Sequence, residues 1–293
     1  MKRIGWIGTG IMGKSMCGHL LKAGYEVAVT TRTRSKAEEL LQAGAVWKDT
    51  PKGVAEVSDC VFSIVGYPED VESVMLGATG ALAGLAAGGI LVDMTTSKPS
   101  LAVAISEAAA KKGVRTLDAP VSGGDTGARE AKLAIMVGGD QSAYDEVLPM
   151  FELMGQNIRR LGDAGAGQHT KMVNQILVAA GMIGTVESLM YAVSAGLDME
   201  EVISVVGKGA GANWAVNNLG PKIAQGNYDP GFFIKHFVKD LGIAMEEARR
   251  MKLALPGLAT AQQFYHAAMA EGLEDLGTQG LYKVYQRLNG RDS

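Results

Sequence analysis

The chain has 293 residues, of which 47% are hydrophobic and 20% are charged. This composition is typical of a folded globular protein rather than a disordered one, and the length favours two domains. The formal net charge of −3 gives no indication of binding to nucleic acid or to an anionic membrane surface.

Cysteine usage and the chain start exclude several further classes. Cys17 and Cys60 lie far apart, without CxxC spacing, so we interpret them as reduced thiols and expect a cytoplasmic protein. No HExxH or comparable spacing predicts a metal site. Four glycines interrupt the N-terminal MKRIGWIGTGIMG, which argues against a signal peptide. Glu187 interrupts the longest apolar run of the second half, which argues against a membrane-spanning helix.

The first half of the chain alternates short apolar runs with amphipathic stretches. In chain order, the strand candidates are RIGWIG, EVAVT, CVFSIV, ILVDMT, VRTLDAP and AIMVGG. Such alternation indicates an α/β domain with a parallel sheet. Nearly continuous apolar runs are expected for strands that are covered on both faces.

The pattern changes near residue 162. From Gly165 to about Ala195 the sequence predicts one long helix, and the remainder is helical between the turn-rich segments GKGAGAN, GNYDPG and LPG. We therefore expect an α/β domain with a mostly parallel sheet over residues 1–162. An all-helical domain is expected over residues 163–293.

The glycines at the end of the first strand predict a phosphate site. Gly8, Gly10 and Gly13 of GTGIMG fit the G-x-G-x-x-G pattern at a strand-to-helix junction. Glycines there allow a tight turn and close approach of a pyrophosphate, and the helix N-terminus adds N–H donors. A glycine-rich turn without a ligand is the alternative, but the position favours a dinucleotide. The first domain is thus predicted to be of Rossmann type.

The end of the second strand bears on the choice between NAD and NADP. NAD sites usually place an acid there, but VTTRTRSK has none between Val29 and Lys36. Arg32 is placed to pair with a 2′-phosphate in bidentate fashion, and the Thr31 and Thr33 hydroxyls can donate hydrogen bonds. We expect NADP(H), with NAD(H) as an additional cofactor left open. A solvated charged turn is the competing interpretation.

Four segments together resemble one family. They are GWIGTGIMG, DAPVSGGDTGA, GAGQHTKMVNQ and FFIKHFVKDLGIA. In order and spacing, over essentially the whole chain, they are similar to the β-hydroxyacid dehydrogenases, which act on 3-hydroxyisobutyrate, tartronate semialdehyde (2-hydroxy-3-oxopropionate) or 4-hydroxybutyrate. The resemblance implies a Rossmann-type domain, an all-helical domain and an active site in the cleft between them. It also implies a homodimer or homotetramer formed through the helical domain.

The resemblance implies roles for individual residues. The family pattern G-x-G-x-x-x-K-x-x-N is matched by Gly165, Gly167, Lys171 and Asn174, with the lysine as the catalytic residue. The catalytic candidates are Lys171, Asn174 and Ser122. The candidates for substrate binding are Ser122, Gly123, Gly124, Lys171, Asn174, Gln175, Trp214, Phe232 and Asp240. The candidates for cofactor binding are Gly8, Thr9, Gly10, Ile11, Met12, Gly13, Thr31, Arg32, Thr33, Val65, Thr96 and Lys239.

The chain departs from the family pattern at two places. Gln175 stands where many members have a second Asn, although tartronate semialdehyde reductases are similar there, and His236 replaces a common aliphatic residue. Lys171 is retained, which argues against the related imine reductases. His169 lies two residues before Lys171, so in a helix it faces another side, and we interpret it as structural.

The residue types suit hydride transfer. In the reducing direction a lysine ammonium can stabilise the growing alkoxide and then donate a proton. The Ser122 hydroxyl and the N–H groups of Gly123 and Gly124 would form a pocket for a carboxylate. A lysine near a helix start is usually solvated when taken alone, and the surrounding motifs favour catalysis. Three aromatic residues are candidates for closing the site, or equally for core packing: Trp214, Phe232 and Phe233.

We therefore expect an NADPH-dependent reductase of a small carboxylate-bearing semialdehyde. Tartronate semialdehyde is the first choice, and the alternatives are succinic semialdehyde (4-hydroxybutyrate), methylmalonate semialdehyde, glyoxylate and 3-hydroxyisobutyrate. A cofactor-binding regulator without catalysis is the remote alternative, because such relatives lose the lysine. The expected partners are a small anionic substrate and further copies of the chain, with no nucleic acid, membrane or metal.

Overall fold

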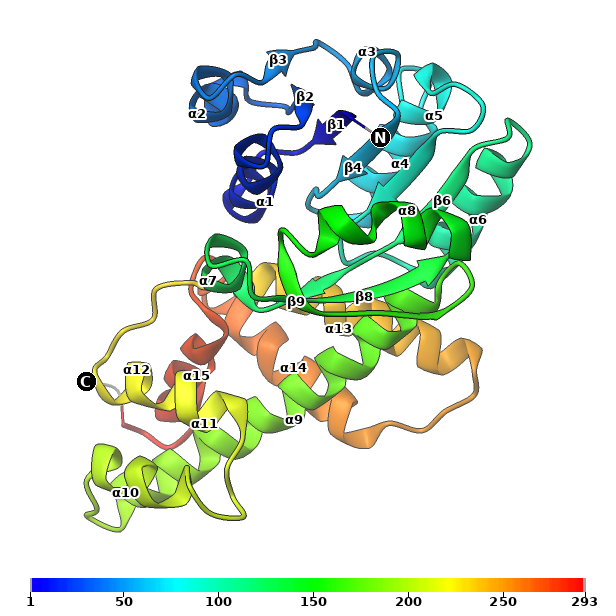
Figure 1. Cartoon of the computed structure of the whole chain (residues 1–293). Helices are drawn as coiled ribbons and strands as arrows, with labels where there is room; N and C mark the ends of the chain where they lie inside the picture. Colours follow the sequence, from blue (N-terminus) through cyan, green and yellow to red (C-terminus); the bar gives the residue numbers. More distant parts are fainter. Residues whose placement is uncertain (1, 292–293) are drawn as a thin grey trace. The chain divides into compact units, whose positions relative to one another are not determined.

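The computed structural model describes residues 2–291. The chain divides into two compact units, Met1–Lys171 and Met172–Ser293 (Figure 1). The division falls inside helix α9 (Ala166–Ser194), whose first turn is hydrogen-bonded to the sheet of the first unit. The domain boundary expected at residue 162 stays a prediction.

The first unit contains one mixed sheet with helices between its strands, as expected. The described strands are β1 (Arg3–Ile7), β2 (Glu26–Thr30), β3 (Val46–Trp47), β4 (Cys60–Ser63), β5 (Ile90–Asp93), β6 (Arg115–Asp118), β7 (Val121–Ser122), β8 (Leu133–Gly139) and β9 (Gly155–Gly162). The helices are α1 (Ile11–Lys22), η1 (Arg34–Ala37), α2 (Glu38–Gln42), α3 (Pro51–Ala55), α4 (Pro68–Leu76), α5 (Ala81–Gly84), α6 (Pro99–Ala110), α7 (Gly124–Arg129) and α8 (Gln141–Phe151).

The strand order confirms a mostly parallel, Rossmann-like sheet. Strands β3, β2, β1, β4, β5 and β6 follow one another in space, and every neighbouring pair among them is parallel. Strand β8 then pairs antiparallel with β6 and β7 and parallel with β9. The carboxyl ends of β1, β4, β5 and β6 therefore meet at one edge of the sheet, which is where open α/β sheets bind ligands.

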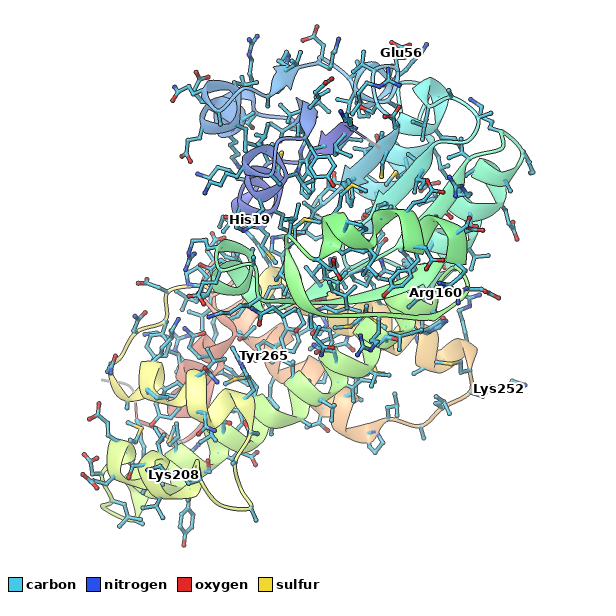
Figure 2. All side chains as sticks on the ribbon, in the orientation of Figure 1. His19, Glu56, Arg160, Lys208, Lys252 and Tyr265 are labelled. Atoms are coloured by element: carbon cyan, nitrogen blue, oxygen red, sulfur yellow. The ribbon has the colours of Figure 1, made fainter. Side chains whose placement is uncertain are left out.

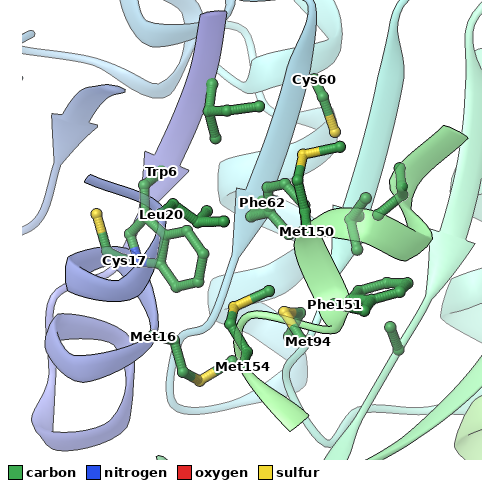
Figure 3. Packing of buried hydrophobic residues seen from close by; sticks show 14 of the residues in the cluster. Trp6, Met16, Cys17, Leu20, Cys60, Phe62, Met94, Met150, Phe151 and Met154 are labelled. Carbon is green, nitrogen blue, oxygen red and sulfur yellow. The ribbon is translucent and has the colours of Figure 1, made fainter. Parts of the chain in front are cut away.

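Side chains of successive strand residues enter two different cores, one on each face of the sheet. Phe62 belongs to the core formed with α1 and α8, whereas its neighbour Val61 belongs to the core formed with α3 to α6. In the first core, Trp6 stacks on Phe62 with ring centroids 5.6 Å apart, and Phe151 meets Phe62 edge-on at 6.1 Å (Figure 3). The alternation explains why the strands read as continuous apolar runs.

Cys17 and Cys60 lie in this same core, in α1 and β4 (Figure 3). Both are buried free thiols, and burial raises the pKa of each thiol. A thiol held in its neutral form by an apolar environment is a poor nucleophile. The two residues therefore act as packing groups.

The second unit is helical, as expected. Beyond the part of α9 after Lys171, its helices are α10 (Met199–Val206), α11 (Trp214–Asn218), α12 (Gly220–Ala224), α13 (Ile234–Arg250), α14 (Pro256–Ala270), η2 (Thr278–Gly280) and α15 (Leu281–Leu288). Phe237 of α13 meets Tyr265 of α14 edge-on at 4.8 Å, and the Tyr265 hydroxyl donates to the Thr278 carbonyl oxygen at 3.0 Å. Figure 2 labels Tyr265 among the side chains of this unit.

Helix α9 is long and apolar enough, by length and composition alone, to cross a membrane. This differs from the expectation that Glu187 argues against a membrane-spanning helix. Core helices of soluble proteins pass the same test, and Met182, Val186 and Leu189 of α9 are fully buried in the core of the second unit. The apolar character of this side of the helix is thus accounted for by packing.

Candidate active site

The glycine-rich loop after β1 has the shape that a pyrophosphate requires. Gly8 has φ +95°, and a Cβ on it would lie 2.1 Å from the Ile64 carbonyl oxygen. A Cβ on Gly13 would lie 2.2 Å from the Gly8 carbonyl oxygen, so α1 packs tightly on the loop. A Cβ on Gly10 would meet no atom within 4 Å. The first and third glycines thus permit the turn and the close packing, and the second faces open space, as in dinucleotide sites.

The other residues of this loop differ in exposure. Thr9 is buried, Met12 is half-buried, and Ile11 is exposed at the surface. The Thr9 N–H donates to the Thr31 hydroxyl oxygen at 3.5 Å, which connects the loop to the end of β2. Those two strand ends together form the region in which an adenosine ribose lies in Rossmann domains.

Arg32 projects into solvent at the end of β2. Its side chain is 85% exposed and pairs with Asp70 of α4 at 3.3 Å. The Arg34 guanidinium lies over the Trp47 ring at 5.3 Å, and Thr33 is exposed. An exposed guanidinium in a loose ion pair can exchange its carboxylate partner for a phosphate at little cost.

The loops after β4 and β5 are hydrogen-bonded to each other. The Val65 N–H donates to the Thr95 hydroxyl oxygen at 2.9 Å. Asp93 accepts from the Ser63 hydroxyl at 2.8 Å and from the Thr95 N–H at 3.1 Å. Thr96 follows directly and is half-buried. These contacts fix the position of Thr96 and Val65 at the carboxyl edge of the sheet.

The DAPVSGG segment leaves the same edge from β6. Ser122 ends the short strand β7 and is half-buried. Gly123 and Gly124 follow with φ +134° and +63°, conformations that favour glycine. Because neither carries a side chain, their backbone N–H groups remain approachable by a small anion.

Lys171 is buried, with 6% of its surface exposed. Its Nζ donates to the Val121 carbonyl oxygen at 2.9 Å, which places the ammonium beside the Ser122–Gly124 segment. A lysine that merely lies near a helix start would extend its ammonium into water. The solvated interpretation of Lys171 is therefore wrong for this structure.

Two further residues support the lysine helix: Asp118, which the resemblance placed only in the substrate-binding segment DAPVSGG, and Gln168, which the sequence reasoning missed. Asp118, at the end of β6, accepts from the N–H groups of Gly165 and Gln168, each at 2.8 Å. Burial raises the pKa of Asp118 to about 6, against the lowering effect of these hydrogen bonds. Gln168 is fully buried and bridges to the loop after β5. The sequence marks Gln168 only as a polar residue between Gly167 and Lys171 of the family pattern.

In the second unit, two hydrogen bonds and one ion pair link four of the candidate residues. The Asn174 amide donates to Gln175 Oε1 at 2.7 Å, and the Gln175 amide donates to Asp240 Oδ2 at 2.5 Å. Lys239 Nζ lies 3.2 Å from Asp240 Oδ1. Gln175 and Asp240 are buried. Helix α9 and helix α13 are thus joined by polar side chains that the sequence assigned to the substrate and the cofactor.

The aromatic candidates of the second unit separate into two kinds. Phe232 is half-buried and meets Phe237 edge-on at 5.9 Å, which favours core packing. Trp214 begins α11 and is 64% exposed, so it is not a core residue. Phe233 meets the His236 ring edge-on at 5.9 Å. Burial and then nearby Lys239 lower the pKa of His236.

Among residues 2–291, no group of three or more His, Cys, Asp or Glu side chains could hold a metal ion. His169 is exposed. The polar groups brought together in the first unit are those of the glycine loop, the DAPVSGG segment and Lys171. Such an arrangement can bind a dinucleotide phosphate and place an ammonium beside a small anion pocket.

Comparison with known proteins matches this organisation over nearly the whole chain. Residues 3–162 match the NAD binding domain of 6-phosphogluconate dehydrogenase. Residues 165–285 match a domain described as the NAD-binding domain of NADP-dependent 3-hydroxyisobutyrate dehydrogenase. Together the two matches establish NAD(P)(H) as the cofactor that this chain binds.

Individual relatives agree. The chain is 52% identical to a probable 3-hydroxyisobutyrate dehydrogenase-like protein of Arabidopsis thaliana, over 98% of this chain and 86% of that protein. It is 37% identical to the 2-hydroxy-3-oxopropionate reductase of Escherichia coli, over 97% of each. The solved structure of Psf3 in complex with NADP+ and 2-OPP superimposes with a TM-score of 0.88 at 26% identity, over 96% of this chain and 99% of that one. The chain belongs to the β-hydroxyacid dehydrogenase family, and it is an NAD(P)-dependent oxidoreductase acting on CH–OH groups.

Proposed function

We propose that this enzyme is an NADPH-dependent reductase of a small semialdehyde that bears a carboxylate, with tartronate semialdehyde as the leading substrate. The observation that carries the proposal is the buried ammonium of Lys171, held at 2.9 Å from the Val121 carbonyl oxygen beside Ser122, Gly123 and Gly124. The 37% identity to a 2-hydroxy-3-oxopropionate reductase over nearly the whole chain supports a substrate of this class.

In this proposal Lys171 acts on the carbonyl oxygen of the aldehyde. When bound, the nicotinamide supplies the hydride that adds to the carbonyl carbon. As negative charge develops on the oxygen, the Lys171 ammonium stabilises it and transfers one proton from Nζ, which gives the alcohol. The lysine then regains a proton from solvent, and in the oxidising direction the same nitrogen accepts the hydroxyl proton.

The proposal assigns the carboxylate of the substrate to the segment from Ser122 to Gly124. The hydroxyl of Ser122 and the backbone N–H groups after it are donors of the kind that bind small anions. The positive φ values of both glycines mean that a side chain at either position would strain this backbone. Asn174 and Lys239 are proposed to take part in the same reaction. Gln175 accepts a hydrogen bond from Asn174, and Asp240 accepts one from Gln175 and pairs with Lys239.

NADP(H) is the proposed cofactor, with NAD(H) as a weaker substitute. Arg32 supports this, because its exposed guanidinium at the end of β2 is matched to a 2′-phosphate, and Asp70 is the acid with which it pairs. An acid at the end of β2, which would favour the ribose hydroxyls of NAD(H), is absent from residues 30–36.

We further propose that copies of the chain associate through the helical unit. Val173, Leu177 and Tyr191 of α9 are 59%, 69% and 75% exposed, and they recur at helical spacing. Large apolar side chains exposed along one helix favour self-association. Light scattering is expected to give a dimer or tetramer mass, and a monomer mass would contradict it.

The buried thiols Cys17 and Cys60 accord with the reducing cytoplasm as the compartment.

The test of the function is the oxidation of NADPH, followed by absorbance, with tartronate, succinic and methylmalonate semialdehydes and glyoxylate. We expect the highest kcat/KM with tartronate semialdehyde, and a preference for NADPH over NADH. The Lys171→Ala variant is expected to bind NADPH with an unchanged Kd while its kcat falls by about a thousandfold or more.

Lys132→Ala is the matched control, because Lys132 is an exposed lysine of the same unit paired only with Glu130 in the described contacts. Its kcat should equal that of the unaltered enzyme. Turnover by Lys171→Ala close to that of the control would refute the role of the lysine. No turnover of any semialdehyde by the unaltered enzyme would refute the substrate class.

A further inference from the structure

The first turn of α9 is held by the carboxylate of Asp118. Both oxygens are used, because Oδ1 accepts from the Gly165 N–H and Oδ2 from the Gln168 N–H, each at 2.8 Å. The first N–H groups of a helix have no partner within the helix, and a carboxylate at this end also interacts favourably with the helix dipole. Asp118 is 4% exposed, so this side chain faces the helix and not solvent.

Gln168 joins the same turn to the loop that carries Thr96. The Ser97 N–H donates to Gln168 Oε1 at 2.9 Å, and Gln168 Nε2 donates to the Thr95 carbonyl oxygen at 2.7 Å. The two hydrogen bonds thus flank Thr96 on either side along the chain. Because Gln168 is completely buried, both bonds are shielded from competing water.

Glycines bring the turn into direct contact with the sheet backbone. A Cβ on Gly167 would lie 2.4 Å from the Asp118 carbonyl oxygen and 2.5 Å from that of Met136. A Cβ on Gly138 of β8 would lie 2.6 Å from the Gly167 nitrogen. The start of α9 therefore rests on β6 and β8 without room to shift, and the two polar side chains set its direction.

Lys171 follows this turn at once, three residues after Gln168. Its long side chain has many rotamers, so the place of Nζ depends on where the helix begins as well as on the bond to the Val121 carbonyl oxygen. An error of about 1 Å in the position of a catalytic group can cost about a hundredfold in rate. Side chains that hold the helix start thus control the chemistry without touching the substrate.

We propose that Asp118 and Gln168 are positioning residues that set Lys171 for proton transfer and couple it to the Thr95–Ser97 loop. The inference rests on the proposed role of Lys171. It gives Asp118, which belongs to the DAPVSGG segment, a role in the helix rather than in substrate binding. It also predicts that a disturbance of the loop around Thr96 is transmitted to the lysine.

The first experiment uses Gln168→Glu, which keeps the shape of the side chain. One oxygen of the new carboxyl group still accepts from the Ser97 N–H, but the other then faces the Thr95 carbonyl oxygen. When the new carboxyl group is ionised, these two oxygens repel each other; when it is protonated, its O–H donates to the carbonyl oxygen. We expect kcat at pH 8 to fall roughly tenfold to a hundredfold and to recover as the pH is lowered toward 5. Asp118, whose pKa is about 6, faces the same turn in both proteins, so the test is the ratio of the variant's kcat to that of the unaltered enzyme at each pH; a ratio that did not change with pH would overturn the proposal.

Thr170→Ala is the matched control. Among the described contacts the Thr170 hydroxyl donates within the helix, to the Ala166 carbonyl oxygen at 2.8 Å, so its loss should leave kcat and the pH profile unchanged. Melting temperature and NADPH Kd are measured for both variants. A purely structural role of Gln168 would lower the melting temperature while the folded enzyme kept its kcat and its profile, which would also refute the proposal.

A second experiment does not depend on activity. Acetic anhydride labels lysine Nζ atoms, and mass spectrometry gives the labelling rate of Lys171 relative to exposed Lys208, which Figure 2 labels. We expect this ratio to rise at least about threefold in Asp118→Asn and in Gln168→Ala, because a displaced ammonium loses its protection. An unchanged ratio in both would overturn the proposal. If the unaltered enzyme reduced no semialdehyde, the proposed function would fail while this ratio still tested the two residues.

Discussion

Gly13→Ala tests whether close packing requires glycine in this loop or whether the loop only matches the G-x-G-x-x-G pattern. A Cβ on Gly13 would lie 2.2 Å from the Gly8 carbonyl oxygen and 2.8 Å from Ile64 Cγ2, and real Cβ contacts shorter than 3.0 Å essentially do not occur. The start of α1 must therefore move away from the loop by about 1 Å. The backbone N–H groups that would bind a pyrophosphate move with it.

The size of the effect follows from this displacement. Overpacking of this kind costs typically about 1–3 kcal/mol of unfolding free energy, or a fall in melting temperature of roughly 2–10 °C. We expect the Kd for NADPH to rise by at least about tenfold, which corresponds to about 1.4 kcal/mol of binding free energy.

Two neighbouring glycines provide the controls. Gly18 lies within α1, and a Cβ there would make only an ordinary contact of 3.9 Å with Leu40 Cδ2. Gly18→Ala should therefore stabilise the helix by up to about 1 kcal/mol and leave the NADPH Kd unchanged. Gly10→Ala meets no atom within 4 Å, so it should keep its melting temperature but weaken NADPH binding about tenfold, because its methyl group would occupy the space left for the phosphate.

The assay is a titration of NADPH fluorescence with each of the three variants, paired with thermal melts. The informative result is the separation of stability from binding: both lost in Gly13→Ala, only binding lost in Gly10→Ala, and neither in Gly18→Ala. If Gly10→Ala bound NADPH as tightly as the unaltered chain, the loop would not contact the cofactor. If Gly13→Ala retained both properties, the packing argument would be wrong.

Three further predictions are independent of these. Burial raises the pKa of Asp118 from 3.8 to about 6, so the folded state binds this proton more tightly than the unfolded state. The stabilising contribution of the proton is complete below pH 4 and is lost as the pH rises through 6, by about 3 kcal/mol. In urea titrations, the free energy of unfolding relative to Asp118→Asn should therefore fall by about 3 kcal/mol between pH 4 and pH 7.5, and a difference that did not vary with pH would contradict this. Arg32→Ala should raise the KM for NADPH by about tenfold or more while the KM for NADH stays within twofold, and equal changes for both cofactors would exclude a contact with the 2′-phosphate. Phe151→Ala should lower the free energy of unfolding by about 3–5 kcal/mol through its contact with Phe62, and chemical denaturation that gave less than 1 kcal/mol would show that the core had closed over the gap.

Most of the sheet could be predicted because its strands are apolar on both faces. The six expected strands all occur, and β1, β2, β4 and β5 each contribute to a core on either side. Strands β3 and β7 have two residues each, too few for any periodicity. Strand β9 (GQNIRRLG) lies at the edge of the sheet beside β8, with several side chains exposed. Because many of its residues are polar, it lacks the apolar run by which the six expected strands were predicted. The antiparallel direction of β8 left no mark on its composition.

The site was predictable where a backbone conformation demands a particular residue, and not where a fold contact does. Gly8, Gly13, Gly123 and Gly124 are marked in the sequence because their conformations or contacts exclude side chains. Gln168 bonds to backbone groups 71 and 73 residues earlier in the chain, and any buried amide at that position would look the same in a sequence. The roles assigned to the candidate residues stay predictions until the variants are measured.

The cost of burying Lys171 bears on its role more than its motif does. Removing an ammonium from water costs several kcal/mol even after relaxation, unless hydrogen bonds and charges compensate. A neutral residue such as Met or Leu would fill the same space at 6% exposure without that cost. The turn before Lys171 nevertheless contains a helix start capped by Asp118, two glycines in close contact with the sheet and a buried glutamine. Stability alone does not favour that arrangement, whereas a reaction that needs a positioned cation does. The same reasoning predicts that Lys171→Met, unlike most substitutions of buried residues, will melt at a temperature equal to or above that of the unaltered enzyme while losing its turnover.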